Sequence, residues 1–184
     1  EERSVGSRPK TENVALRPLL SVRYLLNRTG GESFVDKESG ETEMGDFSYL
    51  KTSGGYYIYE NENYIPYGFS YDYYVTKDYF ESVSKTKYSN IMLKAVVLND
   101  EQVKKYSYMF DNLANLKSDD DSGVTLETSG EALKTDSARL KATSATKFTF
   151  DNTGFSATVK RDKETLVFFS IPYDEGWSAT VNGK

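Results

Sequence analysis

Aromatic rings beside carboxylates are the groupings in this sequence with the clearest capacity for chemistry. Two such clusters occur, over 71–74 (Tyr-Asp-Tyr-Tyr) and 173–177 (Tyr-Asp-Glu-Gly-Trp). A flat ring can stack on a sugar face while an adjacent carboxylate accepts hydrogen bonds from its hydroxyl groups. The candidate glycan-binding residues are Tyr71, Asp72, Tyr73, Tyr173, Asp174 and Trp177. The alternative is structural, because Tyr and Trp at strand ends often close a core while their polar atoms reach water. Their usual placement in proteins favours this second interpretation.

No pattern in the sequence predicts a catalytic centre. Carboxylates that could be paired for glycoside hydrolysis are Glu60, Asp72, Asp174 and Glu175. With 28 acidic residues, some pairs will look suggestive by chance, and most are solvated surface charges. Ser82 and Lys85 form a Ser-x-x-Lys pattern on an expected helix, but it recurs elsewhere and lacks the partner Ser-Asp-Asn or Lys-Thr-Gly motif. We therefore expect no activity from this segment alone.

Metal and nucleotide sites have equally little support. Counted from Asp119, the acidic loop has Gly123 at position five and Gly130 at position twelve. An EF-hand loop needs glycine at position six and glutamate at position twelve. The loop is therefore interpreted as solvated, and neither a Walker motif nor a Gly-x-Gly-x-x-Gly motif is present. We expect no metal and no cofactor.

Composition excludes several classes of protein. The 184 residues carry a net charge of −5, which argues against nucleic-acid binding. Cys and His are absent, which excludes disulfides, Cys nucleophiles, Ser-His-Asp triads and ordinary zinc sites. No apolar stretch reaches the 18 or more residues of a membrane span. The polar composition of 1–13, which includes Pro9, predicts a flexible segment, and the length predicts one domain over 14–184.

Strands and helices are expected in two regions. Strands are predicted over 22–27, in a hairpin of 47–51 with 56–60 around Gly54-Gly55, and over 67–71. A helical insertion is expected over about 76–110. Thr76 caps its first helix, a second covers 88–97, and Asn99 with Gln102 forms a capping box that opens a third.

Beyond residue 123 the apolar pattern changes to a period of two. Strands are predicted around Ala138-Leu140-Ala142, Phe148-Phe150 and Phe155-Ala157-Val159, and over 166–171 and 177–181. The fold class is therefore mainly β with a helical insertion (α+β): an antiparallel, jelly-roll-like β-sandwich. Asn182-Gly183 predicts a type I′ turn. Because no return strand follows, we expect the domain to be truncated at its C-terminus, with 177–181 at an exposed edge.

Three stretches resemble YfhO-family proteins. Residues 19–26 (LLSVRYLL) are similar to the segment that opens their extracytoplasmic part. Residues 59–69 (YENENYIPYGF) are similar to the family's Tyr-Glu-Asn … Pro-x-Gly-Phe block, and 166–184 to its Pro-Tyr-Asp-x-Gly-Trp … Val-Asn-Gly-Lys motif. The final block is the most specific of the three.

The resemblance implies a polytopic bacterial membrane protein of the GT-C glycosyltransferase type. In Gram-positive bacteria this family is associated with glycosylating lipoteichoic acid or another cell-envelope polymer. The chain would then be a non-catalytic domain on the outer face of the cell membrane. Its partners would be the membrane helices of the parent protein and an envelope glycopolymer. The family's catalytic carboxylate lies outside this segment, so no catalytic residue is transferred. The alternative is a stand-alone cell-surface β-sandwich that binds carbohydrate or protein.

Overall fold

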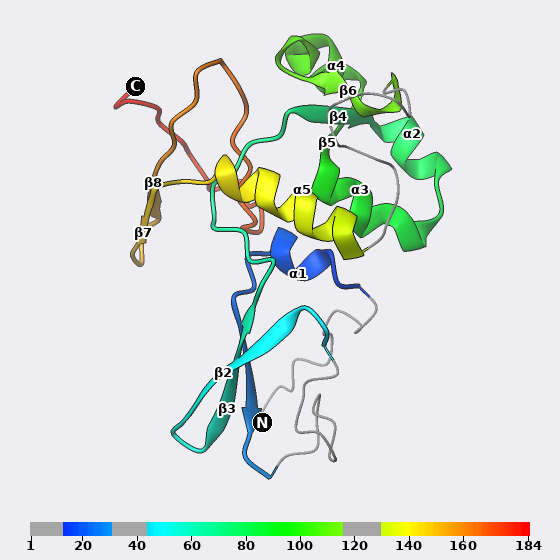
Figure 1. The fold of residues 1–184 in the computed structure, drawn as a ribbon. Coiled ribbons are helices and arrows are strands. Elements are labelled where there is room, and N and C mark those ends of the chain that lie inside the picture. The colour runs from blue at the N-terminus through cyan, green and yellow to red at the C-terminus, as the bar shows by residue number, and fades with distance from the viewer. Residues whose placement is uncertain (1–12, 31–43, 116–129) are drawn as a thin grey trace.

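The helices gather around a small parallel sheet, and an antiparallel sheet extends away from them (Figure 1). The computed structural model describes residues 13–30, 44–115 and 130–184. They form an α+β fold, which confirms the predicted class in its coarse form. The predicted flexible segment lies outside them except for Asn13, as does the acidic loop that begins at Asp119. None of the helices in the described part has the length and apolar character needed to cross a membrane.

The antiparallel sheet confirms the predicted N-terminal hairpin. Its strands are β1 (Tyr24–Arg28), β2 (Phe47–Ser53) and β3 (Tyr56–Asn61), in the order β1-β3-β2. Gly54 and Gly55 have φ angles of 58° and 79°, the left-handed pair that a tight hairpin turn requires. A small cluster of Met44, Phe47 and Tyr59 is buried against one face.

Helices form in the predicted insertion, but the helix predicted over 88–97 ends at Lys94, and the β-branched Val96 and Val97 lie in a strand. The sheet within the insertion is parallel. Strands β4 (Tyr73–Thr76), β5 (Ala95–Leu98) and β6 (Asp111–Asn112) pair in the order β5-β4-β6. The connecting helices are α2 (Lys77–Ser82), α3 (Tyr88–Lys94) and α4 (Asp100–Tyr106), with short 3-10 turns at Lys85–Lys87, Ser107–Met109 and Leu113–Asn115. Thr76 caps α2, and the Asn99–Gln102 capping box opens α4. The helices between β4 and β5 return the chain to the starting end of the sheet. The second strand therefore runs in the same direction as the first, and the two pair in parallel.

The strand predicted around Ala138, Leu140 and Ala142 is wrong, because these residues lie in helix α5 (Gly130–Ala142). The buried positions in and just after this helix are Asp136, Ser137, Leu140 and Thr143. This is the i, i+1, i+4, i+7 spacing of one helical face. Of the three alternating residues only Leu140 is buried, and Ala138 and Ala142 are exposed, so their alternation does not mark one face of a strand. Helix α5 packs near α3, while α1 (Leu16–Leu19) also contacts α3.

The C-terminal region contains less sheet than predicted. Strands β7 (Lys147–Phe150) and β8 (Phe155–Thr158) pair as a hairpin. The strands predicted over 67–71 and 166–171 are reduced to one antiparallel bridge between Phe69 and Phe168. No strand forms over 177–181, although the Asn182-Gly183 turn is present, with φ angles of 53° and 78°. The described residues therefore do not confirm a jelly-roll sandwich.

The main core lies where these parts meet. It includes Ile65 and Phe69, both fully buried, with Leu93 from α3 and Leu140 from α5. The ring of Phe69 lies 5.2 Å from that of Phe168 between centroids. Aromatic contacts of this kind stabilise a core beyond the area that they bury. This packing joins the C-terminal region to the rest of the domain.

Asp46, just before β2, makes stability depend on pH. Its side chain is buried, and burial raises the pKa of its carboxyl, although its own backbone N–H and Arg17 oppose this. The folded state therefore holds this proton more tightly than the unfolded chain does. The contribution to the free energy of unfolding rises as pH falls through the raised pKa towards the unfolded value of about 3.9. We expect Asp46→Asn to flatten this part of the curve in urea unfolding between about pH 4 and 7. An unchanged pH dependence would contradict the assignment.

Candidate functional site

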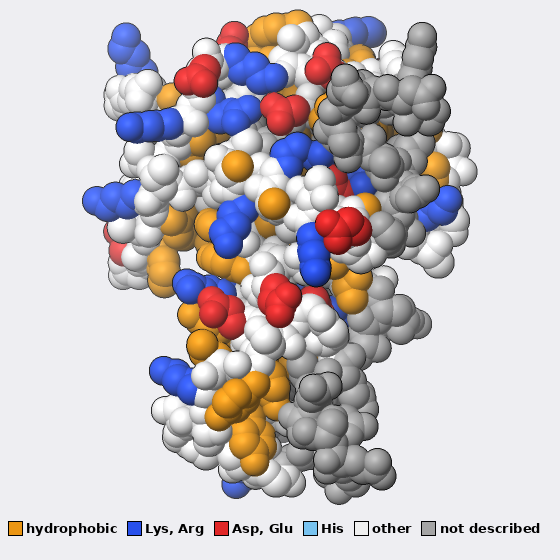
Figure 2. Space-filling view, viewed as in Figure 1, with side chains coloured by type: hydrophobic (Ala, Val, Ile, Leu, Met, Phe, Trp, Pro, Cys, Tyr) orange, Lys and Arg blue, Asp and Glu red, His pale blue; other side chains and the backbone are white. Residues whose placement is uncertain are grey.

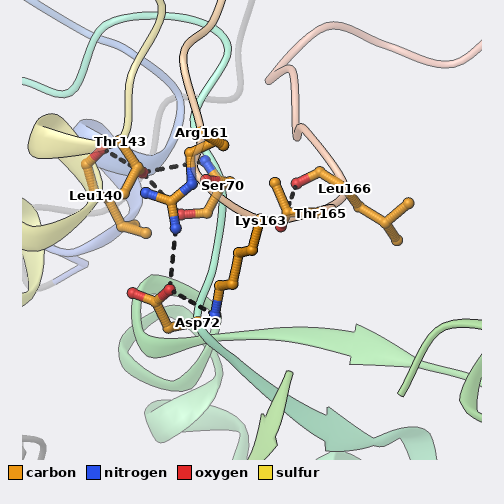
Figure 3. Close-up of polar contacts among 8 residues, drawn as sticks. All are labelled: Ser70, Asp72, Leu140, Thr143, Arg161, Lys163, Thr165 and Leu166. Atoms are coloured by element: carbon orange, nitrogen blue, oxygen red, sulfur yellow. Dashed lines mark hydrogen bonds and ion pairs between the residues drawn. The ribbon is translucent and has the colours of Figure 1, made fainter. Parts of the chain in front are cut away.

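Asp72, one of the predicted glycan contacts, forms an ionic junction with the C-terminal region. Its Oδ1 atom lies 3.1 Å from a terminal guanidinium nitrogen of Arg161 and 3.5 Å from Nζ of Lys163. Figure 3 shows the carboxylate between these two side chains. The backbone carbonyl of Asp72 also accepts a 2.9 Å hydrogen bond from Asp111, which begins β6. Asp72 therefore connects the parallel sheet to the segment after β8.

Hydrogen bonds in both directions between Thr143 and the backbone of Ser70 strengthen the same junction. Thr143 Oγ1 accepts a 3.1 Å hydrogen bond from the backbone N–H of Ser70. The hydroxyl of Thr143 can in turn donate its proton to the carbonyl of Ser70, at 2.8 Å, or to that of Leu140, at 2.9 Å. These contacts hold the end of α5 against the residues before Asp72 (Figure 3). The surroundings of Asp72 are thus fixed by three separate segments.

A shallow cleft of about 280 Å³ lies beside this junction. It is lined by Tyr108, Met109, Phe110, Asp111, Lys163 and Glu164. Partial desolvation and the carboxylate of Glu164 raise the pKa of the exposed Tyr108 phenol. The cleft thus offers an exposed ring beside two carboxylates and an ammonium group, a set that can hydrogen-bond a polyhydroxylated ligand.

The structure buries the two rings that flank Asp72. The Tyr71 hydroxyl donates a 2.7 Å hydrogen bond to the carbonyl of Met92, and burial raises the pKa of this phenol far above its usual value. Tyr73 lies in β4, with the guanidinium of Arg139 5.6 Å from the centre of its ring. Neither ring presents an open face to solvent, so Asp72 is the member of this cluster that lies nearest the surface.

The second predicted cluster lies on the surface. Asp174 accepts a 2.8 Å hydrogen bond from the N–H of Gly176, which shapes a turn. The indole of Trp177 packs edge-on against Phe155, with ring centres 5.6 Å apart, and donates a 3.3 Å hydrogen bond to the carbonyl of Pro172. Tyr173 is 86% exposed. None of the hydrogen bonds or ring contacts of the described residues joins this cluster to Tyr71, Asp72 or Tyr73.

A larger cleft, of about 310 Å³, lies at the base of the antiparallel sheet. It is lined by Arg23, Ser48, Glu60, Asn61, Glu62, Tyr64 and Lys141. Arg23 donates a 3.0 Å hydrogen bond to Glu60, and its guanidinium carbon lies 5.0 Å and 5.3 Å from the ring centres of Tyr24 and Tyr64. Its hydrogen bond to Glu60 raises the pKa of Arg23. The cation is therefore held in place by two rings and one carboxylate.

Several groups in this cleft, here called the Arg23 cleft, remain available to a ligand. Glu62 and Lys141 are exposed and form no ion pair with another described residue. Tyr64 is half-buried, and burial raises the pKa of its phenol, with Arg23 acting in the opposite direction. A neutral ligand rich in hydroxyl groups matches this mixture of an acid, a base and a ring. The sequence did not predict this cleft as a binding site. Its only signal there was the resemblance of residues 59–69 to a family block, which includes Glu60, Glu62 and Tyr64.

The described residues contain no group of three or more acidic side chains placed to hold a metal ion. They form an α+β domain with two polar surface clefts. Residues 124–184 match the family model of YfhO, a bacterial membrane protein. This match confirms the predicted resemblance for the C-terminal third of the chain. Comparisons with curated proteins and with solved structures found no match.

The matched region is packed into the rest of the domain. Besides Asp72–Arg161, a 3.1 Å hydrogen bond joins the hydroxyls of Ser21 and Ser170. Phe69, in the second resembling block, pairs with Phe168, in the third. Residues before 124 therefore share a core with the matched residues, and the blocks at 19–26 and 59–69 stay predicted resemblances.

Proposed function

We propose that this chain is an extracytoplasmic domain of a polytopic, GT-C-type membrane glycosyltransferase that modifies lipoteichoic acid or another cell-envelope polymer. In this proposal the domain positions the acceptor glycan, and catalysis belongs to the membrane-embedded part of the parent protein. The observation that carries the proposal is the YfhO match over 124–184. This region contributes Lys141 to the Arg23 cleft and Lys163 and Glu164 to the second cleft.

The Arg23 cleft has the chemistry that holding a glycan requires. Sugar hydroxyls can donate to the carboxylate of Glu62 and accept from Lys141, and charge-assisted hydrogen bonds of this kind are the stronger ones. The face of Tyr64 adds an apolar surface for the carbon-bound hydrogens of a sugar ring. Because the lining carries both charge signs, a neutral or zwitterionic glycan suits it better than a highly charged one.

Glu62→Gln is expected to weaken binding of neutral oligosaccharides from cell-envelope polymers about tenfold. The substitution keeps the size of the side chain but removes the charge that strengthens its hydrogen bonds, and a bond to a charged group contributes about 1.5–3 kcal/mol. Titration calorimetry with the purified domain measures this. Glu101→Gln on α4 is the matched control, since Glu101 is exposed and lines neither cleft. Unchanged affinity in Glu62→Gln would reject the Arg23 cleft as the binding site.

The same titration tests the predicted contacts Tyr173, Asp174 and Trp177. A stacked ring contributes about 1–3 kcal/mol in other ring-stacking sites, so a contact here implies at least a severalfold loss in Trp177→Ala. Unchanged binding by folded Trp177→Ala would assign this residue to packing against Phe155 alone. No turnover of a lipid-linked sugar or oligosaccharide by the domain is expected, and observed turnover would overturn the non-catalytic role.

A further inference from the structure

One face of the antiparallel sheet is apolar and exposed. Residues Tyr24 and Leu26 of β1 lie opposite Glu60 and Ile58 of β3, and Tyr56 lies at the far end of β3. Tyr24, Leu26 and Tyr56 are 42%, 58% and 42% exposed. Because side chains alternate along a strand, these residues share the face opposite Leu25 and Tyr59, which pack in the small core cluster. We call this surface the Leu26 face.

The antiparallel sheet that carries the Leu26 face stands apart from the helices (Figure 1). Figure 2 shows hydrophobic side chains gathered over the same part of the protein. Leu50 lies where the pairing register of β2 shifts, between Tyr49 and Lys51, and its side chain is 45% exposed. Contiguous exposed apolar surface of this kind marks sites of protein or membrane interaction.

The charges around this face decide between these two kinds of partner. Arg28 and Lys51 are exposed, and neither forms an ion pair with another described residue. Glu60, at the other end of the face, is neutralised by Arg23. Among the described residues, the unpaired charge at the far end is therefore positive, although the whole chain carries −5. A positive rim around Tyr and Leu side chains complements an anionic lipid surface.

We propose that the Leu26 face rests on the surface of a lipid bilayer that contains anionic headgroups. Tyr side chains are enriched at the membrane–water interface, where the ring meets the acyl boundary and the hydroxyl meets the headgroups. Leu26 and Ile58 supply the apolar surface that enters this boundary. Arg28 and Lys51 attract anionic lipid, each contributing severalfold to affinity near the surface. The match of the C-terminal third to a bacterial membrane protein is consistent with this location.

Co-sedimentation with lipid vesicles tests the contact. The folded domain is expected to bind phosphatidylcholine vesicles that contain phosphatidylglycerol and to bind pure phosphatidylcholine vesicles severalfold more weakly. Leu26→Ser is expected to lower affinity about tenfold. Arg28→Gln is expected to lower it about fivefold, and only where phosphatidylglycerol is present. Phe150→Ser is the matched control, because Phe150 is 81% exposed on β7, outside this face.

Each result bears on the proposal. Circular dichroism shows whether Leu26→Ser remains folded, and Tyr24→Ser on the same face provides a second variant. Equal vesicle binding by wild type, folded Leu26→Ser and folded Tyr24→Ser would overturn the contact. Equal binding to both kinds of vesicle would overturn the role of anionic headgroups. Self-association of the wild type that Leu26→Ser abolishes, with no vesicle binding, would instead assign the face to a second copy of the chain.

Discussion

Asp136→Ala is expected to lower the free energy of unfolding by about 3–5 kcal/mol, because it leaves a buried positive charge without its partner. The ammonium group of Lys94 on α3 pairs with Asp136 on α5, and both side chains are almost completely buried. The other carboxylate oxygen of Asp136 accepts a 2.9 Å hydrogen bond from Arg139. A loss of this size is a large part of the total stability of most domains.

Urea unfolding of the wild type and Asp136→Ala measures the effect. The double variant Lys94→Met/Asp136→Leu is expected to be clearly more stable than Asp136→Ala, since apolar residues can replace a buried ion pair without leaving a charge behind. Glu81→Ala is the exposed control: its pair with Lys77 is 3.6 Å long, and its loss is expected to change stability by at most about 0.5 kcal/mol. A similarly small change in Asp136→Ala would show that the buried pair contributes little.

The turns and helix starts that were predicted correctly are determined by residues close to one another in the sequence. Gly54-Gly55 sets the hairpin because its left-handed backbone angles match the twist of two paired strands. Thr76 and Asn99 begin helices because each side chain accepts a hydrogen bond from a free N–H group three residues later. Such signals are complete within a few residues and depend little on the remainder of the fold.

The incorrect predictions concern long-range pairing. The continuous apolar run at 166–171 indicated a strand, but only Phe168 pairs, with a residue about 100 positions earlier. Residues 138–142 alternate and yet form a helix, because Leu140 and the Lys94–Asp136 pair are buried against α3. A period of two over five residues is too short to exclude a helical face. Parallel pairing of β4 with β5 depends on how the intervening helix returns the chain.

The candidate site shows the same limit. Adjacent residues suggested that Tyr71, Asp72 and Tyr73 act together, but extended chain turns successive side chains to opposite sides. The two rings are therefore buried while Asp72 reaches Arg161 and Lys163. The Arg23 cleft combines the residue before β1 with residues from β2, β3 and α5, which no local motif could bring together.

The two proposals fit together in space. Glu60 and Ser48 line the Arg23 cleft, and their strand register places them opposite each other and beside Tyr24, which belongs to the Leu26 face. With this face on a bilayer, the cleft would open close to the lipid headgroups. A glycan attached to a membrane lipid could then reach it without leaving the surface. This consequence rests on the proposed glycan binding, whereas lipid contact can be tested without it.

Gly68→Ala is expected to destabilise the domain by about 2–4 kcal/mol, since residue 68 lies where two of the resembling blocks meet. Its φ angle of +74° is in the left-handed region, which costs a residue with a Cβ atom about 1–2 kcal/mol. A Cβ at this position would also lie 2.8 Å from Cε1 of Phe169 and 3.2 Å from Cβ of Ala145. Overpacking of this kind typically costs about 1–3 kcal/mol.

A second glycine separates the two causes of this loss. Gly55 has a φ angle of +79°, and a Cβ there would approach nothing closer than Oγ1 of Thr29, at 4.0 Å. Gly55→Ala should therefore show the backbone effect alone, about 1–2 kcal/mol. The difference between the two variants in urea unfolding gives the contribution of the contact with Phe169. If Gly68→Ala is no more destabilising than Gly55→Ala, Phe169 can move aside, and the junction between 59–69 and 166–184 is less tightly packed than the structure indicates.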